Sequence, residues 1–157
     1  MRGLQNMKFV QWSVPVLAGM SLLFSGCGYE WPEGEVINEV VVGPHTQASY
    51  EVNVYLPPGY ETDASGLPLA LVLDGDMGFS DVATMVDEAI ESGLAEPVVL
   101  LGVGNQDWRG MDMTPTPVGS EPSGGIAAYF DWIETELVPA AEAEYGCGGS
   151  RDNRIVT

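Results

Sequence analysis

The sequence predicts an α/β fold in which antiparallel strands come first and a parallel sheet with flanking helices follows. Three observations predict it. Residues 50–56 alternate apolar and polar side chains, as expected for a strand with one buried face. Residues 67–73 and 98–103 are nearly continuous apolar runs, which are typical of strands buried on both faces. A segment with helical spacing lies between these runs, and strand–helix–strand indicates a parallel pair.

The first elements form an antiparallel pair. Residues 36–42 are rich in β-branched side chains and predict a strand. A Gly-Pro turn follows at 43–44, and the alternating strand 50–56 is expected to pair with the strand before it. In this alternation Asn53 and Tyr55 are expected on the solvent side, and a Pro-Pro-Gly sequence ends the strand.

Two helices are predicted. The first runs from about Ser80, its expected N-cap, to Ser92, with Gly93 as the C-cap. Its apolar positions are Val82, Met85, Val86, Ala89 and Ile90. The second follows a proline-containing loop at 104–124, and its buried face is expected to hold Ile126, Phe130, Ile133 and Leu137.

The last part of the chain predicts a further strand. Pro139 is expected to bend or interrupt the second helix, and glycines at 146–149 break the chain. Residues 154–157 then start what we expect to be another buried strand. A central strand of four residues would leave the sheet with an unfinished edge, so we interpret the chain as part of a longer domain.

Charge and composition limit the function. The 157 residues are 45% apolar, which suits one globular domain. After Cys27 there are three arginines, no lysine and all 23 acidic residues, and such a surface repels nucleic acid. We therefore expect no nucleic-acid partner. The acidity indicates either affinity for cations or life in high salt, or simply a well-solvated surface, which we favour.

The N-terminus has the organisation of an export signal. Arg2 and Lys8 precede an apolar run at 14–24, which is too short to span a bilayer, and Ser-Gly then leads directly to Cys27. The small residues before Cys27 resemble a lipobox, although Phe24 stands where leucine is usual. We expect residues 1–27 to be a lipoprotein signal peptide including the lipidated cysteine, residues 28–35 a tether and residues 36–157 the domain. The chain would then be exported and membrane-anchored, on the periplasmic or cell-surface side.

Two alternatives remain for this segment: an ordinary secretory peptide with an incidental cysteine, or a buried N-terminal helix. Cys147 is the other cysteine, and it could pair with Cys27, pair elsewhere or stay unpaired. Two cysteines and one histidine cannot form a structural zinc site without carboxylates, so we expect no metal and no cofactor.

Several pieces, in order, carry a family resemblance. These are residues 50–60 (YEVNVYLPPGY), 67–76 (LPLALVLDGD), 109–115 (RGMDMTP), 136–139 (ELVP) and 151–157 (RDNRIVT). Together, over residues 46–157, they resemble the N-terminal portion of the "putative esterase" family of α/β-hydrolases, which includes enterochelin esterases, esterase D and feruloyl esterases. The resemblance implies a truncated α/β-hydrolase-type three-layer sandwich acting on a small-molecule ester.

The resemblance also implies site residues. In that fold one oxyanion-hole donor is a backbone N–H from a loop after an early strand. The candidate donors here are the N–H groups of Asp76 and, alternatively, Met77, with Gly75 shaping the loop. A strand-ending turn is the competing interpretation of this loop. Arg109 and Asp112 are substrate-pocket candidates, which could pair with each other, or Arg109 could meet an anionic group of the substrate.

The triad cannot be assigned. The nucleophile of this fold lies in a Gly-x-Ser-x-Gly elbow after the strand that resembles 151–157, and the acid and histidine follow it. Neither Ser120 nor Ser123 lies in such an elbow. The expected function is a serine-type carboxylic ester hydrolase of the siderophore-, feruloyl- or acyl-ester class, with this chain an inactive fragment. Alternatives are a non-catalytic surface lipoprotein that binds a partner or acts as a scaffold, and acyl transfer on the same fold.

Overall fold

A mixed sheet forms the centre of the computed structural model, which describes residues 33–43, 49–60, 66–104 and 107–157. Within these residues the strand order is β1-β2-β4-β3-β5. The pairs β1–β2 and β2–β4 are antiparallel, whereas β3 runs parallel to both β4 and β5. Antiparallel strands followed by parallel ones confirm the predicted fold class. The strands are β1 (Glu35–Val42), β2 (Ser49–Leu56), β3 (Leu69–Leu73), β4 (Val99–Val103) and β5 (Arg154–Val156).

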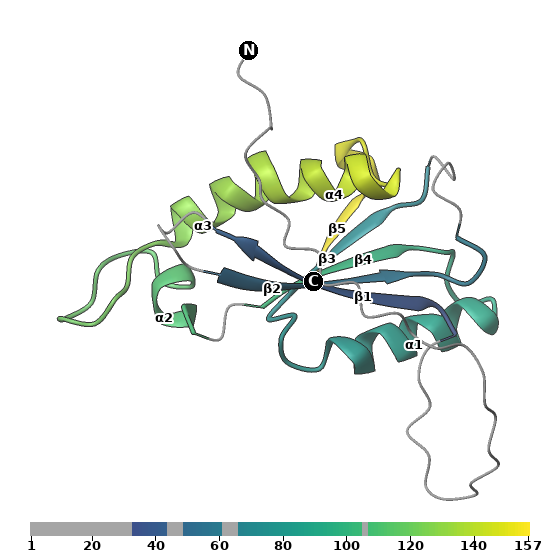
Figure 1. Cartoon of the computed structure of the whole chain (residues 1–157), viewed down its shortest axis with the longest axis horizontal. Coiled ribbons are helices and arrows are strands. Elements are labelled where there is room, and N and C mark those ends of the chain that lie inside the picture. The colour runs from purple at the N-terminus through teal and green to yellow at the C-terminus, as the bar shows by residue number, and fades with distance from the viewer. Residues whose placement is uncertain (1–32, 44–48, 61–65, 105–106) are drawn as a thin grey trace, which may run out of the picture.

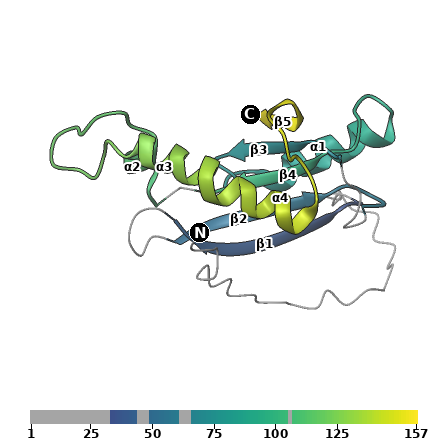
Figure 2. The same ribbon diagram turned by 90° about the horizontal axis from the view of Figure 1, so that it is seen from above.

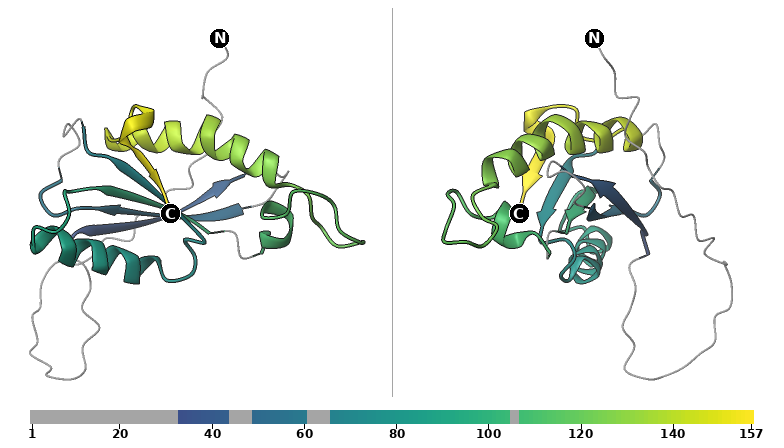
Figure 3. Two further views of the ribbon diagram at one scale, coloured as in Figure 1. Left: turned by 180° about the vertical axis from the view of Figure 1, so that it is seen from behind. Right: turned by 60° about the vertical axis from the view of Figure 1, so that its left-hand side comes forward.

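Helices cover both faces of this sheet and give three layers (Figure 1), and the view from above shows the α3–α4 helix lying across the strands (Figure 2). Helix α1 lies on one face, and the long α3–α4 helix lies on the other (Figure 3). The chain steps from β3 to β4 in one direction and from β4 back past β3 to β5 in the other. Right-handed crossovers therefore place the two connecting helices on opposite faces. The helices are α1 (Phe79–Glu91), α2 (Arg109–Asp112), α3 (Ile126–Trp132), the π-helical turn η1 (Ile133–Leu137), α4 (Val138–Tyr145) and the 3₁₀ turn η2 (Arg151–Asn153).

Each face of the sheet buries its own apolar cluster. The cluster under α3–α4 includes Tyr50, Tyr129 and Trp132, and the one under α1 includes Tyr55 and Phe79. Strand β2 contributes side chains to both clusters, because it lies between β1 and β4 and is covered on both sides. The prediction that Asn53 and Tyr55 face solvent is therefore wrong, since both side chains are buried.

Helix α1 differs from its prediction at its start and on its buried face. Gly78 occupies the N-cap position and Phe79 begins the helix, so the predicted Ser80 cap is wrong. Met85 is 61% exposed, whereas the carboxylate of Asp87 is buried. Asp87 accepts hydrogen bonds from the Tyr55 hydroxyl at 2.5 Å and the Glu33 backbone N–H at 2.6 Å. These partners allow a charged residue to face the sheet, which apolar periodicity cannot anticipate.

The second helix is continuous but changes its winding. A π-helical turn at η1 joins α3 to α4, and Pro139 lies in the first turn of α4. Proline has no N–H to continue the ordinary helical bonding, so a change in bonding next to it is expected. The buried face includes Tyr129 and Trp132 of α3, which precede the π-helical turn, and Ile133 at its start. Phe130 is 37% exposed, which corrects the predicted apolar face.

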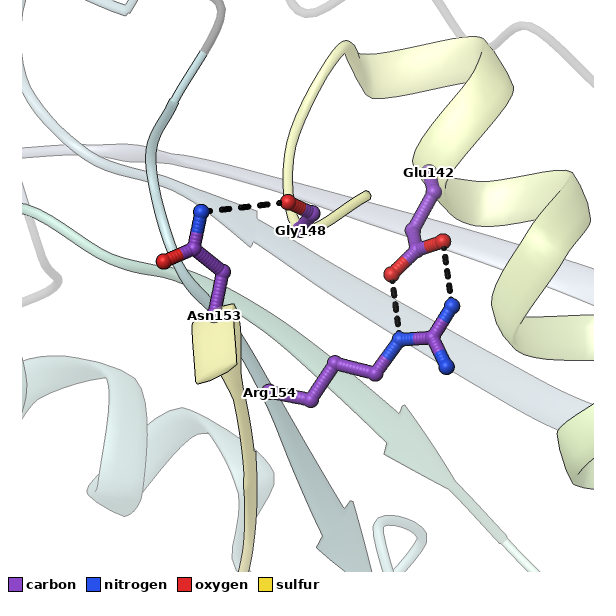
Figure 4. Close-up of polar contacts among 4 residues, drawn as sticks. All are labelled: Glu142, Gly148, Asn153 and Arg154. Carbon is purple, nitrogen blue, oxygen red and sulfur yellow. Dashed lines mark hydrogen bonds and ion pairs between the residues drawn. The ribbon is translucent and has the colours of Figure 1, made fainter. Parts of the chain in front are cut away.

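Strand β5 is exposed, contrary to the prediction of a buried strand. Ile155 and Val156 are 50% and 63% exposed, because β3 is the neighbour of β5 among the strands that the structure describes. The start of β5 is nevertheless fixed by side chains. Arg154 pairs with Glu142 of α4, and the Asn153 side chain donates to the Gly148 carbonyl at 3.3 Å (Figure 4).

Candidate active site

The sheet topology places a candidate site at the carboxyl end of β3. Ligands of open α/β sheets bind outside the carboxyl ends of the strands, where the strand order reverses direction. Here the chain moves from β3 to β4 and then returns to β5, so the reversal lies between β3 and β5. Residues 74–78 follow β3 at this point, and they include the predicted oxyanion-hole candidates.

This loop turns back sharply over β4. Asp74 adopts a left-handed conformation with φ of 55°, which Asp tolerates better than most residues other than glycine. The Gly75 N–H then donates to the Val103 carbonyl at 2.9 Å. A Cβ on Gly75 would lie 2.5 Å from the Val103 nitrogen, so this approach requires glycine. The structure thus gives a physical reason for Gly75 in the loop.

The two candidate donors differ in their backbone bonding. The Met77 N–H donates to the Asp74 carbonyl at 2.9 Å, so it already closes the turn. The Gly75 carbonyl accepts a hydrogen bond at 2.8 Å from the buried side-chain amide of Asn53 on β2. This bond orients the peptide that joins Gly75 to Asp76. Asp76 and Met77 both remain predicted donors, and the Asn53 bond holds the peptide that carries the Asp76 N–H.

Arg109 joins this loop to the 107–125 segment. Its guanidinium forms an ion pair with Asp74, and its side chain remains 54% exposed. The ion pair recorded for Arg109 is with Asp74, whereas Asp112 at the other end of α2 is buried. The sequence singled out Arg109 but could not reveal Asp74 as its partner, because 35 residues separate the two.

Asp112, the last residue of α2, lies in the protein interior. Its side chain is 0% exposed and accepts a 3.0 Å hydrogen bond from the Tyr50 hydroxyl. Burial, and then the nearby Asp112 carboxylate, raise the pKa of Tyr50 well above its ordinary value. Asp112 is therefore a buried acceptor. The sequence predicted Asp112 as a substrate-pocket residue, but its side chain does not reach the surface in this conformation.

Tyr129 on α3 lies next to this pair. Its ring centroid is 5.9 Å from that of Tyr50, and its hydroxyl is buried without a hydrogen-bond partner among the described residues. Burial raises the pKa of Tyr129, and Asp112, Asp74 and Asp76 add to the rise. The phenol of Tyr129 therefore stays neutral. The carboxylates of Asp74 and Asp76 in the loop act on it electrostatically. Apolar periodicity alone did not mark Tyr50 or Tyr129 as part of the site.

The remaining candidate features lie elsewhere. An apolar groove of about 220 Å³ between α3–α4 and β5 contains none of the predicted site residues. Cys147 is a free thiol, and burial raises its pKa to about 11, which makes it a poor nucleophile. Cys27 and the predicted signal peptide lie outside the described residues. Among the residues that are described, no helix is long and apolar enough to cross a membrane.

Comparisons with known proteins support the family and the fold. Residues 43–156 match the family model described as "Putative esterase". The chain is also similar to the "Uncharacterized protein YbbA" of Bacillus subtilis (strain 168), with 27% identity over 107 residues, or 64% of this chain and 42% of that protein.

Solved structures share the fold at low identity. The BES protein from Bacillus cereus has a TM-score of 0.59 and 20% identity, over 90% of this chain and 54% of that one. The enterobactin esterase FES from Shigella flexneri has a TM-score of 0.62 and 16% identity, over 78% and 30% of the two chains. The "Enterobactin and Salmochelin Hydrolase IroE" has a TM-score of 0.61 and 21% identity, over 78% and 51%. The chain thus spans between 30% and 54% of the length of these relatives.

Proposed function

Because the chain belongs to the "Putative esterase" family, we propose that it supplies the oxyanion side of a carboxylic ester hydrolase site. One observation carries the proposal. The loop at 74–78 lies at the topological reversal of the sheet, and a backbone and a side-chain hydrogen bond restrain its first two peptides. A preorganised N–H at this place is what stabilisation of an acyl-transfer oxyanion requires.

In the proposed mechanism the nucleophile is a serine and the intermediate is an acyl-enzyme. The ester carbonyl would lie against the Asp76 N–H, which donates to the oxygen as negative charge develops on it. A second donor would come from the residue after the nucleophile. The 157 residues contain no Gly-x-Ser-x-Gly elbow, so we assign this chain no triad residue. On this proposal residues 1–157 by themselves do not hydrolyse esters.

The proposed substrates are small soluble esters of the siderophore, feruloyl or simple acyl class. Support comes from structural neighbours named as an enterobactin esterase, an enterobactin and salmochelin hydrolase and a ferulic acid esterase. Arg109 contributes an exposed cation beside the loop, and its ion pair with Asp74 leaves much of its side chain accessible. We assign it the role of contacting an anionic group of the substrate.

Membrane anchoring through Cys27 is a separate proposal. It is supported by the positively charged start, the apolar run and the Ser-Gly-Cys sequence, all of which lie in the first 27 residues. Anchoring would place the domain outside the cytoplasmic membrane. The competing function, a non-catalytic lipoprotein that binds a partner, shares this anchor and differs in having no esterase activity.

The complete reading frame that contains these residues provides the test. Its product should hydrolyse p-nitrophenyl butyrate, and a fluorophosphonate probe should label one serine outside residues 1–157. Residues 1–157 expressed alone serve as the control, and they should neither hydrolyse the ester nor react with the probe. Absence of both activity and labelling in the complete product contradicts the esterase proposal and favours the binding lipoprotein.

A further inference from the structure

The side chain of Asn53 crosses a whole strand to reach the candidate site. Asn53 lies on β2 directly opposite Gly102 of β4, and β4 separates β2 from β3. Directly opposed residues point to the same face of an antiparallel pair. A Cβ on Gly102 would lie 2.4 Å from the Phe79 ring, so that face has no space for a side chain at position 102. The Phe79 ring therefore packs directly on Gly102, and position 102 requires glycine.

Both ends of Gly75 are held by groups of the sheet. Its N–H donates to Val103 at 2.9 Å, and its carbonyl accepts from the Asn53 amide at 2.8 Å. The first bond restrains the Asp74–Gly75 peptide, and the bond from Asn53 restrains the peptide between Gly75 and Asp76. No described peptide is cis, and in a trans peptide the N–H points opposite to the carbonyl. The Asp76 N–H therefore points away from Asn53.

We propose that Asn53 is a positioning residue that fixes the Gly75–Asp76 peptide so that the Asp76 N–H faces the reacting carbonyl. This inference rests on the proposed function for its catalytic meaning. The bond itself is buried and joins residues 22 positions apart. An oxyanion donor must point at the place where charge will develop before the reaction begins. Without Asn53 the peptide could rotate, and its carbonyl would lose a buried partner.

The orientation can be measured without any enzymatic activity. In the full chain, NMR should detect a scalar coupling across the hydrogen bond between the Asn53 Nδ2 and the Gly75 carbonyl carbon. In Asn53→Leu, the residual dipolar coupling of the Asp76 N–H should change, while those of Val99–Val103 stay the same. Asn38→Leu is the matched control, because Asn38 is the exposed partner of Asn53 on β1. Its Asp76 coupling should equal that of the wild type.

A second variant covers the case in which Asn53→Leu does not fold. Asn53→Asp keeps the shape of the side chain, but its ionised carboxylate can only accept hydrogen bonds. Asn53→Asp should change the residual dipolar coupling of the Asp76 N–H in the same way as Asn53→Leu. An undetectable hydrogen-bond coupling in the wild type, or an unchanged Asp76 orientation in the folded Asn53 variants, overturns the inference whatever the activity.

Kinetics separate positioning from a merely structural role. In the complete reading-frame product, Asn53→Asp should lower kcat by roughly 10²-fold with little change in KM, because the donor is misdirected in the transition state. A rise in KM together with a smaller folded fraction, without a specific fall in kcat, contradicts positioning. A wild-type product with the measured orientation but no esterase activity contradicts the proposed function, and with it the catalytic role of Asn53.

Discussion

The guanidinium of Arg154 donates two parallel hydrogen bonds to the carboxylate of Glu142, from Nε to Oε1 at 2.6 Å and from Nη2 to Oε2 at 2.7 Å (Figure 4). This pair joins α4 to the first residue of β5. It spans a turn in which Gly146, Gly148 and Gly149 have positive φ. The pair therefore fixes the path of the chain into the strand that, by family resemblance, leads to the nucleophile.

Glu142→Gln should lower the free energy of unfolding by about 1 kcal/mol at neutral pH, because it removes the charge from a bidentate pair. The hydrogen bond from Arg154 lowers the pKa of Glu142 below its ordinary 4.5. A lowered folded-state pKa stabilises the protein above the unfolded value and loses this effect as pH falls through the folded value. Urea unfolding at neutral pH and at about pH 3 should thus show the difference between wild type and variant shrinking in acid. Glu136→Gln, at an exposed position, is the control; an equal loss there contradicts the assignment.

Tyr50→Phe and Tyr129→Phe should have different effects on stability, and only the first should destabilise the protein. Tyr50 donates to buried Asp112, so its loss leaves a buried acceptor short of a partner and should cost about 1–3 kcal/mol. The Tyr129 hydroxyl is buried without a partner among the described residues, so removing it should be neutral or stabilising. Denaturant unfolding of the two variants provides the measurement. Equal destabilisation by both would contradict the hydrogen-bond assignment.

Gly75→Ala should destabilise the domain by about 1–3 kcal/mol, since the new Cβ would overlap the backbone of β4 at Gly102 and Val103. Gly110→Ala is the control, because the nearest atom to its Cβ is the Pro122 carbonyl oxygen at 3.4 Å. Thermal unfolding compares the two variants. A Gly75→Ala protein as stable as Gly110→Ala would show that the loop does not pack on β4 as described.

Arg109→Ala in the complete reading-frame product should raise KM for an anionic ester by roughly threefold to tenfold, a modest effect because the arginine is exposed. KM for a neutral ester should stay the same. Arg151→Ala removes an equally exposed charge elsewhere and is the control. A similar rise in KM for both esters would indicate that Arg109 shapes the loop through Asp74 and does not contact the substrate.

Cys27→Ala should move the protein from the membrane fraction to the soluble fraction, because the lipid chains carried by Cys27 would provide the anchor. Fractionation of cells followed by immunoblotting measures this, with Cys147→Ala as the control that keeps the anchor. Unchanged fractionation of Cys27→Ala would contradict lipidation at this residue.

The strands were predictable because their signal is local. Continuous apolar runs marked β3 and β4, and alternation marked β2, since burial on one or both faces imposes these patterns directly. The burial of the polar side of β2 was not predictable. Asn53 and Tyr55 are buried because α1 covers that face, and the position of α1 depends on how β3, β4 and β5 are arranged in the sheet.

The helices show the same division. Their existence followed from apolar spacing, but Met85 and Phe130 are exposed and Asp87 is buried. Tyr129 and Trp132 form the buried face of α3 in place of Phe130, and hydrogen bonds from Tyr55 and Glu33 allow Asp87 to face inward. Neither effect follows from counting apolar residues.

The sequence by itself therefore determined the fold class, the order of its elements, the family resemblance and the loop that holds the Asp76 candidate. Each of these depends on neighbours in the chain or on the order of segments. Only the tertiary structure decided that Asn53 holds Gly75, that Arg109 pairs with Asp74 and that Asp112 is buried against Tyr50. These pairs are separated by 22 to 62 residues, so their contacts exist only once the sheet brings distant segments together.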